Sequence, residues 1–206
     1  MILTKQNILD FEKLYRTTFI NSINGFKSAS LIGTISNKGN TNLAIFNSVI
    51  HVGASPPALG FLMRPISVER HTYQNIKEVG FYTISHINKD IFKKAHQTSA
   101  RYDEDVSEFD ECGLTPEYSQ ILKAPYVKES KIKIGLKFVE EQEVKYNKTI
   151  FIVGEIVEII VPDEVVAQDG YVDIEKAGTV AISGLDGYHE TKRISRLSYA
   201  KPGKET

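Results

Sequence analysis

The sequence predicts a mainly β protein, folded as a closed or nearly closed antiparallel barrel with a few peripheral helices. Two observations favour this class: short strand-like segments follow one another with turn signals between them, and helical patterns are few and short. The chain has 206 residues and 41% hydrophobic residues, and it shows no internal repeat and no Pro/Gly/Ser-rich linker. We therefore expect one domain, residues 1–206, with a core that needs no disulfide or metal.

The first segment of the chain reads as a helical extension of this domain. Residues 7–15 place their apolar side chains on one helical face, which predicts a short amphipathic helix within an extension spanning residues 1–27. The side chains on that face are Ile8, Phe11, Leu14 and Tyr15.

Three extended segments follow the helical extension. Residues 28–36 read as a strand that ends in a strong turn signal at 37–40. Residues 43–52 form a second extended segment, which Ser55-Pro56-Pro57 ends because proline removes a backbone donor and restricts the preceding residue. Residues 58–63 are the third predicted strand.

A helix is predicted over residues 68–79. Ser67 is a suitable N-cap, Glu69 suits the positive helix start, and Gly80 suits the position after the end. A strand is expected at 81–87. Two shorter helical segments are predicted further on, one over IFKKAHQ (91–97) and one starting at Thr115-Pro116-Glu117.

The second half carries two strand signals. From Lys131 to Phe138 apolar residues alternate with lysines or glycine, so Lys131, Lys133 and Lys137 are predicted on a solvated face. Tyr146-Asn147-Lys148 can turn the chain into a second strand, residues 149–161, which is apolar nearly throughout. Such a strand is expected to be buried on both faces or to lie at a subunit contact.

The net charge, the apolar segments and the cysteine count argue against several classes of partner and location. A net charge of -1 gives no reason to expect nucleic acid or an anionic membrane as partner. The N-terminal residues lack a signal-peptide pattern, and the longest apolar run is too short and too charged to cross a bilayer. The single cysteine, Cys112, cannot form an internal disulfide, which favours a cytoplasmic location.

Familiar catalytic motifs are missing from the sequence. The glycine-rich dinucleotide, phosphate-loop and G-x-S-x-G patterns do not occur, and the five histidines show no metal-ligand spacing, so no metal site is predicted. Asp110 and Glu111 should raise the pKa of the Cys112 thiol, which argues against a cysteine nucleophile.

Residues 41–76 can supply what a flavin mononucleotide (FMN) needs: an apolar slot, hydrogen bonds to the ring edge, and a phosphate site. Arginines, a histidine and a hydroxyl stand just before or inside the start of the predicted helix, where free N–H groups also favour an anion. The candidates are Ala44, Phe46 and Val49 for the slot, Asn47 and Ser48 for the ring edge, and Arg64, Arg70, His71 and Thr72 for the phosphate.

Each candidate also has an ordinary structural interpretation. The arginines could form surface ion pairs, Arg70 for example with Glu69 or Glu78. His71 could cap the helix or be exposed, and Thr72 could simply pack. Asn47 and Ser48 could serve strand-edge hydrogen bonds. The sequence alone leaves a strand, a turn and a surface helix with ordinary charges as an open alternative.

The order of several motifs resembles the flavin reductase-like family with an FMN-binding split barrel, which includes the flavoredoxins. The matching segments run from Ser30 to Pro202, and none is diagnostic by itself. They are Asn42 to Ser48, Ser55-Pro56-Pro57, Arg64, Thr72 to Ile76, Gly80-Phe81-Tyr82, SARYDEDVSEFDECGLTP (99–116), IFIVGEIVEI and Arg196 to Tyr199.

The resemblance implies a split antiparallel Greek-key barrel that works as a homodimer and binds FMN. Residues 42–49 and Ser55 would contact the isoalloxazine and ribityl groups. The four phosphate candidates would hold the phosphate with Asn75 nearby. Ser99 and Arg101, in the 99–102 loop, would close over the flavin from the same or the other subunit. No side chain is assigned to the chemistry itself, although His189 could line the open side of the flavin.

The sequence departs from the family pattern at three places. Ile45 stands where the family often has proline, and Asn47 where it often has serine. Many reductases carry Gly-Asp-His before the "GE-V" strand, and that histidine is linked to nicotinamide handling. Tyr146-Asn147-Lys148 occupies the matching place here, which weakens the case for the nicotinamide step more than for flavin binding.

Three functions stay open at this point. The first is an oxidoreductase that takes hydride from NADH or NADPH onto bound FMN, with the cofactor carrying the chemistry. The second is an FMN-containing electron carrier without direct nicotinamide activity. The third is a barrel that binds a ligand other than flavin. The absorbance of the purified protein, before and after NADH or NADPH, separates them.

Overall fold

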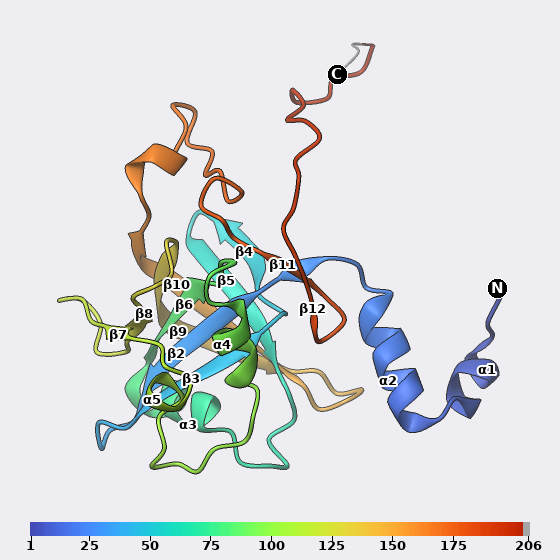
Figure 1. Ribbon diagram of the computed structural model, residues 1–206, viewed down its shortest axis with the longest axis horizontal. Coiled ribbons are helices and arrows are strands. Elements are labelled where there is room, and N and C mark those ends of the chain that lie inside the picture. Colours follow the sequence, from blue (N-terminus) through green and yellow to red (C-terminus); the bar gives the residue numbers. More distant parts are fainter. Residues whose placement is uncertain (204–206) are drawn as a thin grey trace.

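The computed structural model describes residues 1–203 and is mainly β. A seven-stranded antiparallel sheet has the order β3-β2-β6-β9-β10-β5-β4 and curls into a split barrel (Figure 1). The edges are β3 and β4, which follow each other in the chain without pairing in the described ladders. The strands are β2 (Ser30–Ile35), β3 (Thr41–Phe46), β4 (Ile50–Ala54), β5 (Pro57–Met63), β6 (Phe81–His86), β9 (Lys133–Glu143) and β10 (Ile150–Ile160).

Two apolar clusters hold the barrel together. One fills its interior and includes Ile32, Phe61 and Leu136, all fully buried. The other covers the outside of β2 and β3 and includes Leu43 and Phe109. Because β2 is buried on both faces, it needs this second layer, which is supplied partly by α4 (Phe92–Gln97) and α5 (Glu108–Glu111).

The glycine of the "GE-V" strand has a packing role. A Cβ at Gly154 would collide with the hydroxyl of Tyr82, a residue of the Gly80-Phe81-Tyr82 segment on β6. The pairing of β9 with β10 shifts register beside this glycine, between Val153 and Gly154. Two motifs that lie far apart in the sequence therefore meet inside the barrel.

Two predicted segments around the "PP" turn differ in their bounds. The extended segment 43–52 is interrupted at 47–49, so it forms β3 and β4 instead of one strand. The helix predicted from Val68 begins later, as α3 (His71–Val79), with Arg70 rather than Ser67 at its N-cap and Gly80 after its end as predicted. Residues 64–70 instead form a loop between β5 and α3.

The helix predicted to start at Thr115 is wrong. The chain forms β7 (Pro116–Glu117), which pairs with β8 (Tyr126–Val127). The backbone N–H and the hydroxyl of Thr115 both donate to the carboxylate of Glu129, with Oγ1 and Oε1 2.8 Å apart. The hydroxyl that could have capped a helix is thus held by a residue distant in sequence.

The solvated lysine face is correct for Lys131 and Lys137 but wrong for Lys133. That side chain is buried and forms an ion pair with Glu117 on β7. Of the two alternatives for the next strand, β10, burial on both faces is wrong, and a subunit contact stays a prediction. Its first residues alternate between buried and half-buried, and Ile159 is 57% exposed.

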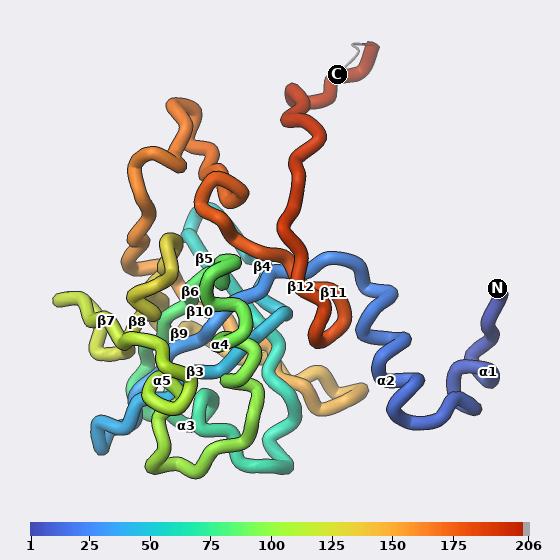
Figure 2. The backbone as a smooth tube through the Cα atoms, in the orientation of Figure 1, coloured from blue at the N-terminus to red at the C-terminus, as the bar shows by residue number. Residues whose placement is uncertain are grey.

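The N-terminal extension is helical, but as two helices rather than one. These are α1 (Lys5–Asp10) and α2 (Lys13–Ser22); the chain breaks between them because Glu12 caps α2 by accepting from the N–H groups of Leu14 and Tyr15. Neither helix contains a buried residue. Both lie to one side of the barrel, away from its core (Figures 1 and 2).

The C-terminal part first adds a small sheet and then leaves the barrel. β1 (Lys27–Ser28), β11 (Ala181–Ser183) and β12 (Gly187–His189) pair antiparallel, and a short 3-10 helix (Asp163–Val165) lies between β10 and β11 in the chain. Residues 190–203 then run outward as an exposed arm (Figure 2). Among the described residues, no helix is long and apolar enough to span a membrane.

Candidate functional site

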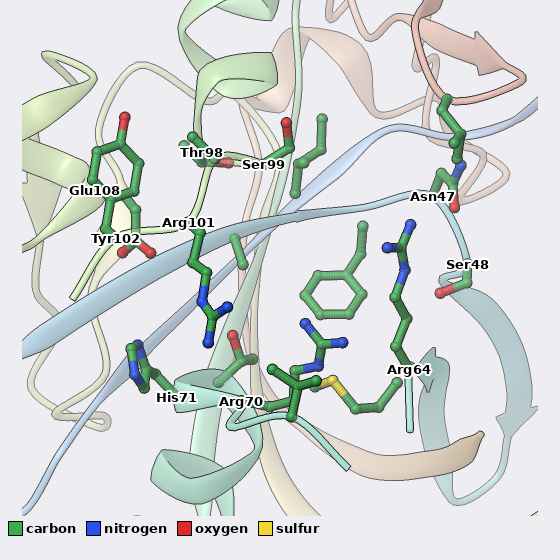
Figure 3. A pocket seen from close by; sticks show the side chains of 18 of the residues that line it. Asn47, Ser48, Arg64, Arg70, His71, Thr98, Ser99, Arg101, Tyr102 and Glu108 are labelled. Carbon is green, nitrogen blue, oxygen red and sulfur yellow. The ribbon is translucent and has the colours of Figure 1, made fainter. Parts of the chain in front are cut away.

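A cavity of about 760 Å³ lies beside β3, at the start of α3. Its wall also includes the end of β5, the loop 98–104 between α4 and α5, and residues near β11 and β12. The volume falls in the range of about 300–1,000 Å³ that is usual for small-molecule sites. Figure 3 shows polar and cationic side chains from several of these segments around this one space.

The cavity brings together ten of the thirteen residues that were predicted to bind a cofactor. They come from β3 and the bend after it, the loop before α3, α3 itself, and the loop after α4. These residues are Ala44, Phe46, Asn47, Ser48, Arg64, Arg70, His71, Thr72, Ser99 and Arg101.

The start of α3 faces the cavity with unused hydrogen-bonding capacity. Arg70, at the N-cap, makes no side-chain cap to the free N–H groups of the first turn. Thr72 is buried, and its Oγ1 accepts a hydrogen bond from the amide of Asn42. Since that amide is the donor, the hydroxyl proton of Thr72 is left to donate elsewhere. Together with the helix dipole, this arrangement suits an anion.

Three guanidinium groups extend into the cavity from two segments: those of Arg64 and Arg70 from the loop before α3, and that of Arg101 from the loop after α4 (Figure 3). Within residues 1–203 none of them forms an ion pair with a carboxylate. The Nε atom of Arg70 is buried and has no hydrogen-bond partner there. Glu69 accepts instead from Gln74. The alternative prediction, a surface ion pair of Arg70 with Glu69 or Glu78, is therefore wrong for residues 1–203.

The other end of the cavity is formed by the bend after β3. Asn47 donates from Nδ2 to the carbonyl of Gly184, 3.1 Å away, which links this bend to the turn between β11 and β12. The hydroxyl of Ser48 both donates to and accepts from the backbone of Leu62. Ser48 thus makes the strand-edge contacts that its ordinary interpretation describes, while still lining the cavity.

An aromatic wall lies between the two polar ends. The ring of Phe46 lines the cavity and packs edge-on against Phe61 of β5, with 5.0 Å between centroids. Phe61 packs in the same way against Tyr82. Side chains of the barrel interior therefore pack behind this wall. A flat ligand would contact a rigid apolar surface.

The structure places four predicted residues away from the cavity wall. Val49 packs against the interior cluster, and Ser55 is exposed in the turn between β4 and β5. The amide of Asn75 donates to Oγ1 of Thr34. His189 forms a 2.8 Å hydrogen bond with Ser183 and packs against Phe26. For these four, contact with a ligand stays a prediction.

Sequence reasoning missed several wall residues. Glu108 lines the cavity and is only 6% exposed; it stands in the "EF" segment of the 99–116 loop, where its burial had no local signal. Asn21 and Asp186 reach the wall from terminal segments that the chain order alone does not place there. The pKa of the Cys112 thiol is raised, as predicted, but mainly by burial and not by the two predicted carboxylates; Tyr102 lowers it, and Glu108 and Glu111 raise it by smaller amounts.

A split antiparallel barrel with a cationic cavity beside its third strand defines a class of flavin-binding proteins, and comparison with known proteins identifies that class here. The model of the flavin reductase like domain matches residues 26–177. The chain therefore belongs to the flavin reductase-like family. Membership supports an oxidoreductase as the general class of protein.

Several known proteins resemble this chain in sequence and in structure. A crystal structure from Shewanella frigidimarina NCIMB 400, described as a candidate flavin reductase with a split barrel domain, is 52% identical and has a TM-score of 0.94, with 97% of this chain and 100% of that chain covered. Flavoredoxin of Desulfovibrio vulgaris (Miyazaki F) is 25% identical with a TM-score of 0.74, covering 87% and 93%. An uncharacterised protein of Aquifex aeolicus (strain VF5) is 30% identical over 147 residues, which span 70% of this chain and 74% of that protein.

Proposed function

We propose that the cavity binds FMN, with the phosphate at the start of α3 and the isoalloxazine along β3 toward Asn47 and Ser48. The observation that carries this proposal is the unpaired set of guanidinium groups, above all the buried Nε of Arg70 without a partner. A buried guanidinium atom without a partner is costly, and a phosphate oxygen would satisfy it.

The remaining contacts follow from the same orientation. Thr72 donates its free hydroxyl proton to the phosphate, and His71 and Arg101 flank it (Figure 3). The ring lies against Phe46, and Ala44 leaves room beside it. Ser99 and Arg101 close the cavity from the loop after α4.

We further propose that the protein is a flavin reductase that uses NADH or NADPH. A bound flavin accepts hydride from a reduced nicotinamide and passes the electrons on to an acceptor. The protein's part is to hold the flavin, to shield one face with Phe46 and to leave the other face accessible. No side-chain acid or base is required, which agrees with the lack of a catalytic triad.

The test is an absorbance spectrum of the purified protein with added FMN, followed by anaerobic addition of NADH and, separately, NADPH. Spectral change on FMN binding and rapid bleaching by either nucleotide are the expected results. No uptake of FMN contradicts the proposed site. It would favour instead a barrel that binds another ligand.

A second candidate is an FMN-containing electron carrier. The specific observation in its favour is Tyr146-Asn147-Lys148, which forms the turn between β9 and β10 where many reductases carry Gly-Asp-His. Tyr146 is 95% exposed and does not line the cavity. FMN that binds tightly but stays oxidised with both nucleotides would support the carrier and contradict the reductase.

We also propose that the chain works as a homodimer. The terminal segments carry apolar side chains that the single chain leaves exposed, such as Leu14 and Ile23 in and after α2, and Leu197 in the C-terminal arm. Apolar surface of this kind marks a contact with another molecule, and a symmetric second copy is the simplest one. The exposed half of β10 is a further candidate for this contact.

Sedimentation of the purified protein tests the dimer directly. Leu14→Ser combined with Ile23→Ser should weaken association, because both changes place hydroxyls where apolar surface is expected to be covered. Tyr118→Ser, an exposed change outside the terminal segments, is the matched control. A wild-type protein that sediments as a monomer contradicts the proposal.

A further inference from the structure

Glu108 is a buried acidic residue in the cavity whose α3 end suits an anion. The residue is 6% exposed, and its carboxyl group accepts a hydrogen bond from the backbone N–H of Leu43, with 2.8 Å between N and Oε2. Figure 3 shows Glu108 at the same end of the cavity as His71 and Arg101, and opposite the end that holds Asn47 and Ser48. A phosphate at the start of α3 would therefore have this buried carboxyl as a neighbour.

Two negative charges at one end of a partly enclosed cavity oppose each other. Burial already raises the pKa of Glu108, while the hydrogen bond from Leu43 and the charge of nearby His71 act in the opposite direction. A bound phosphate would add a further negative charge and so disfavour the ionised carboxylate still more. Protonation is the direct way to relieve this repulsion.

The surroundings of Glu108 are defined by four elements. The α3 start and the α4–α5 loop supply the charged groups that face it across the cavity, and β3 supplies no titratable side chain. Its own helix adds Asp110 and Glu111, both exposed, and Cys112 follows. The facing groups are Arg70, His71, Arg101, Tyr102, Asp103 and Glu104.

We propose that Glu108 is a positioning residue that takes up one proton from solvent when a phosphate-bearing flavin binds. The proton goes to a carboxyl oxygen, and the neutral group stays next to the phosphate without repelling it, still anchored to β3. The inference rests on the proposed FMN site. It adds that affinity for a phosphorylated flavin, but not for riboflavin, is coupled to protonation of this one residue.

The decisive measurement is the number of protons taken up on binding, obtained by calorimetry in buffers of different ionisation enthalpy. Wild type and Glu108→Gln are titrated with FMN and with riboflavin between about pH 5 and about pH 8. Wild type should take up more protons with FMN than the variant does, by at most one. For a fully coupled proton, the FMN dissociation constant of wild type rises by about tenfold per pH unit relative to that of the variant.

Two controls isolate Glu108. Riboflavin lacks the phosphate, so proton uptake with it should be equal in wild type and variant. Glu140→Gln removes an exposed carboxylate on β9 that does not line the cavity, so its FMN titration should match that of wild type. The phosphate's own ionisation affects all variants alike, and it changes affinity with pH in the opposite direction.

A second measurement keeps the inference testable if Glu108→Gln does not fold. Wild type labelled with ¹³C in its glutamate carboxyl carbons is titrated with pH in the presence of FMN and, separately, of riboflavin. One carboxyl should titrate at higher pH with FMN than with riboflavin. FMN binding without such a shift, or with equal proton uptake in wild type and variant, overturns the inference alone. Failure of wild type to bind FMN overturns the proposed function and the inference together.

Discussion

The side-chain amide of Asn42 on β3 donates a hydrogen bond to Oγ1 of Thr72 in the first turn of α3, across 3.0 Å. Both residues are buried, and a second bond of the same kind joins Asn75 to Thr34 on β2. The start of α3 is thereby fixed to the sheet at the point where it meets the cavity. The bond also sets the direction of the Thr72 hydroxyl, because an oxygen that accepts from Asn42 keeps its own proton for another partner.

Thr72→Val should weaken FMN binding by about tenfold, because it removes one hydrogen bond to a charged phosphate, worth about 1.5 kcal/mol. It should also lower the free energy of unfolding by about 1–3 kcal/mol, since the buried amide of Asn42 loses its acceptor. Fluorescence titration with FMN and urea unfolding measure the two effects. Thr72→Ser keeps the hydroxyl and is the control. Unchanged FMN affinity in Thr72→Val would show that this hydroxyl does not meet the phosphate.

Arg64→Ala combined with Arg70→Ala should weaken FMN binding by roughly 2–4 kcal/mol, because charge-assisted contacts to the phosphate are lost. Riboflavin affinity should change far less. The matched control is Lys93→Ala with Lys123→Ala, which removes two exposed cations outside the cavity wall. Equal FMN affinity of the arginine double variant and wild type would reject the phosphate site.

Because of His86, the free energy of unfolding should decrease as the pH is lowered. Burial lowers the pKa of His86 to about 4, whereas an unfolded histidine titrates near pH 6.5. Between these values the unfolded chain binds the additional proton, so the stabilisation is complete above about pH 6.5 and is lost as the pH falls toward 4. The loss amounts to at most about 3 kcal/mol.

Urea unfolding at several pH values measures this loss. His86→Gln should show a flatter dependence on pH than wild type, and His51→Gln, a change at an exposed histidine, should not. A wild type and His86→Gln that lose stability in parallel between these pH values would contradict the assignment.

Tyr82→Phe should raise the free energy of unfolding by about 1 kcal/mol. The Tyr82 hydroxyl is buried without a hydrogen-bond partner among residues 1–203, and an unsatisfied buried polar group is destabilising by about 1–3 kcal/mol. Gly154→Ala should be destabilising by about 1–3 kcal/mol, because its Cβ meets that hydroxyl. The double variant should recover part of the loss. Thermal unfolding of the four proteins checks this, and a Tyr82→Phe less stable than wild type would reveal an unseen partner of the hydroxyl.

Much of the fold could be predicted because its signals are local. The turn at 37–40, the strand at 58–63 and the helix end at Gly80 depend on residues a few positions apart. Turn formers, alternation of apolar residues and left-handed backbone at glycine act within such distances. The same holds for the cavity residues on β3 and α3, which lie within one stretch of the sequence.

What the sequence by itself determined was the set of chemical groups: the arginines, the hydroxyl and the apolar strand residues, in an order typical of one family. Only the tertiary structure decided which of these groups are free. Arg70 has no carboxylate partner within residues 1–203, Lys133 is buried against Glu117, and Thr115 is held by Glu129. Each outcome depends on a residue that folding brings close or keeps away, and the balance between desolvation and pairing at such contacts has no counterpart in local sequence.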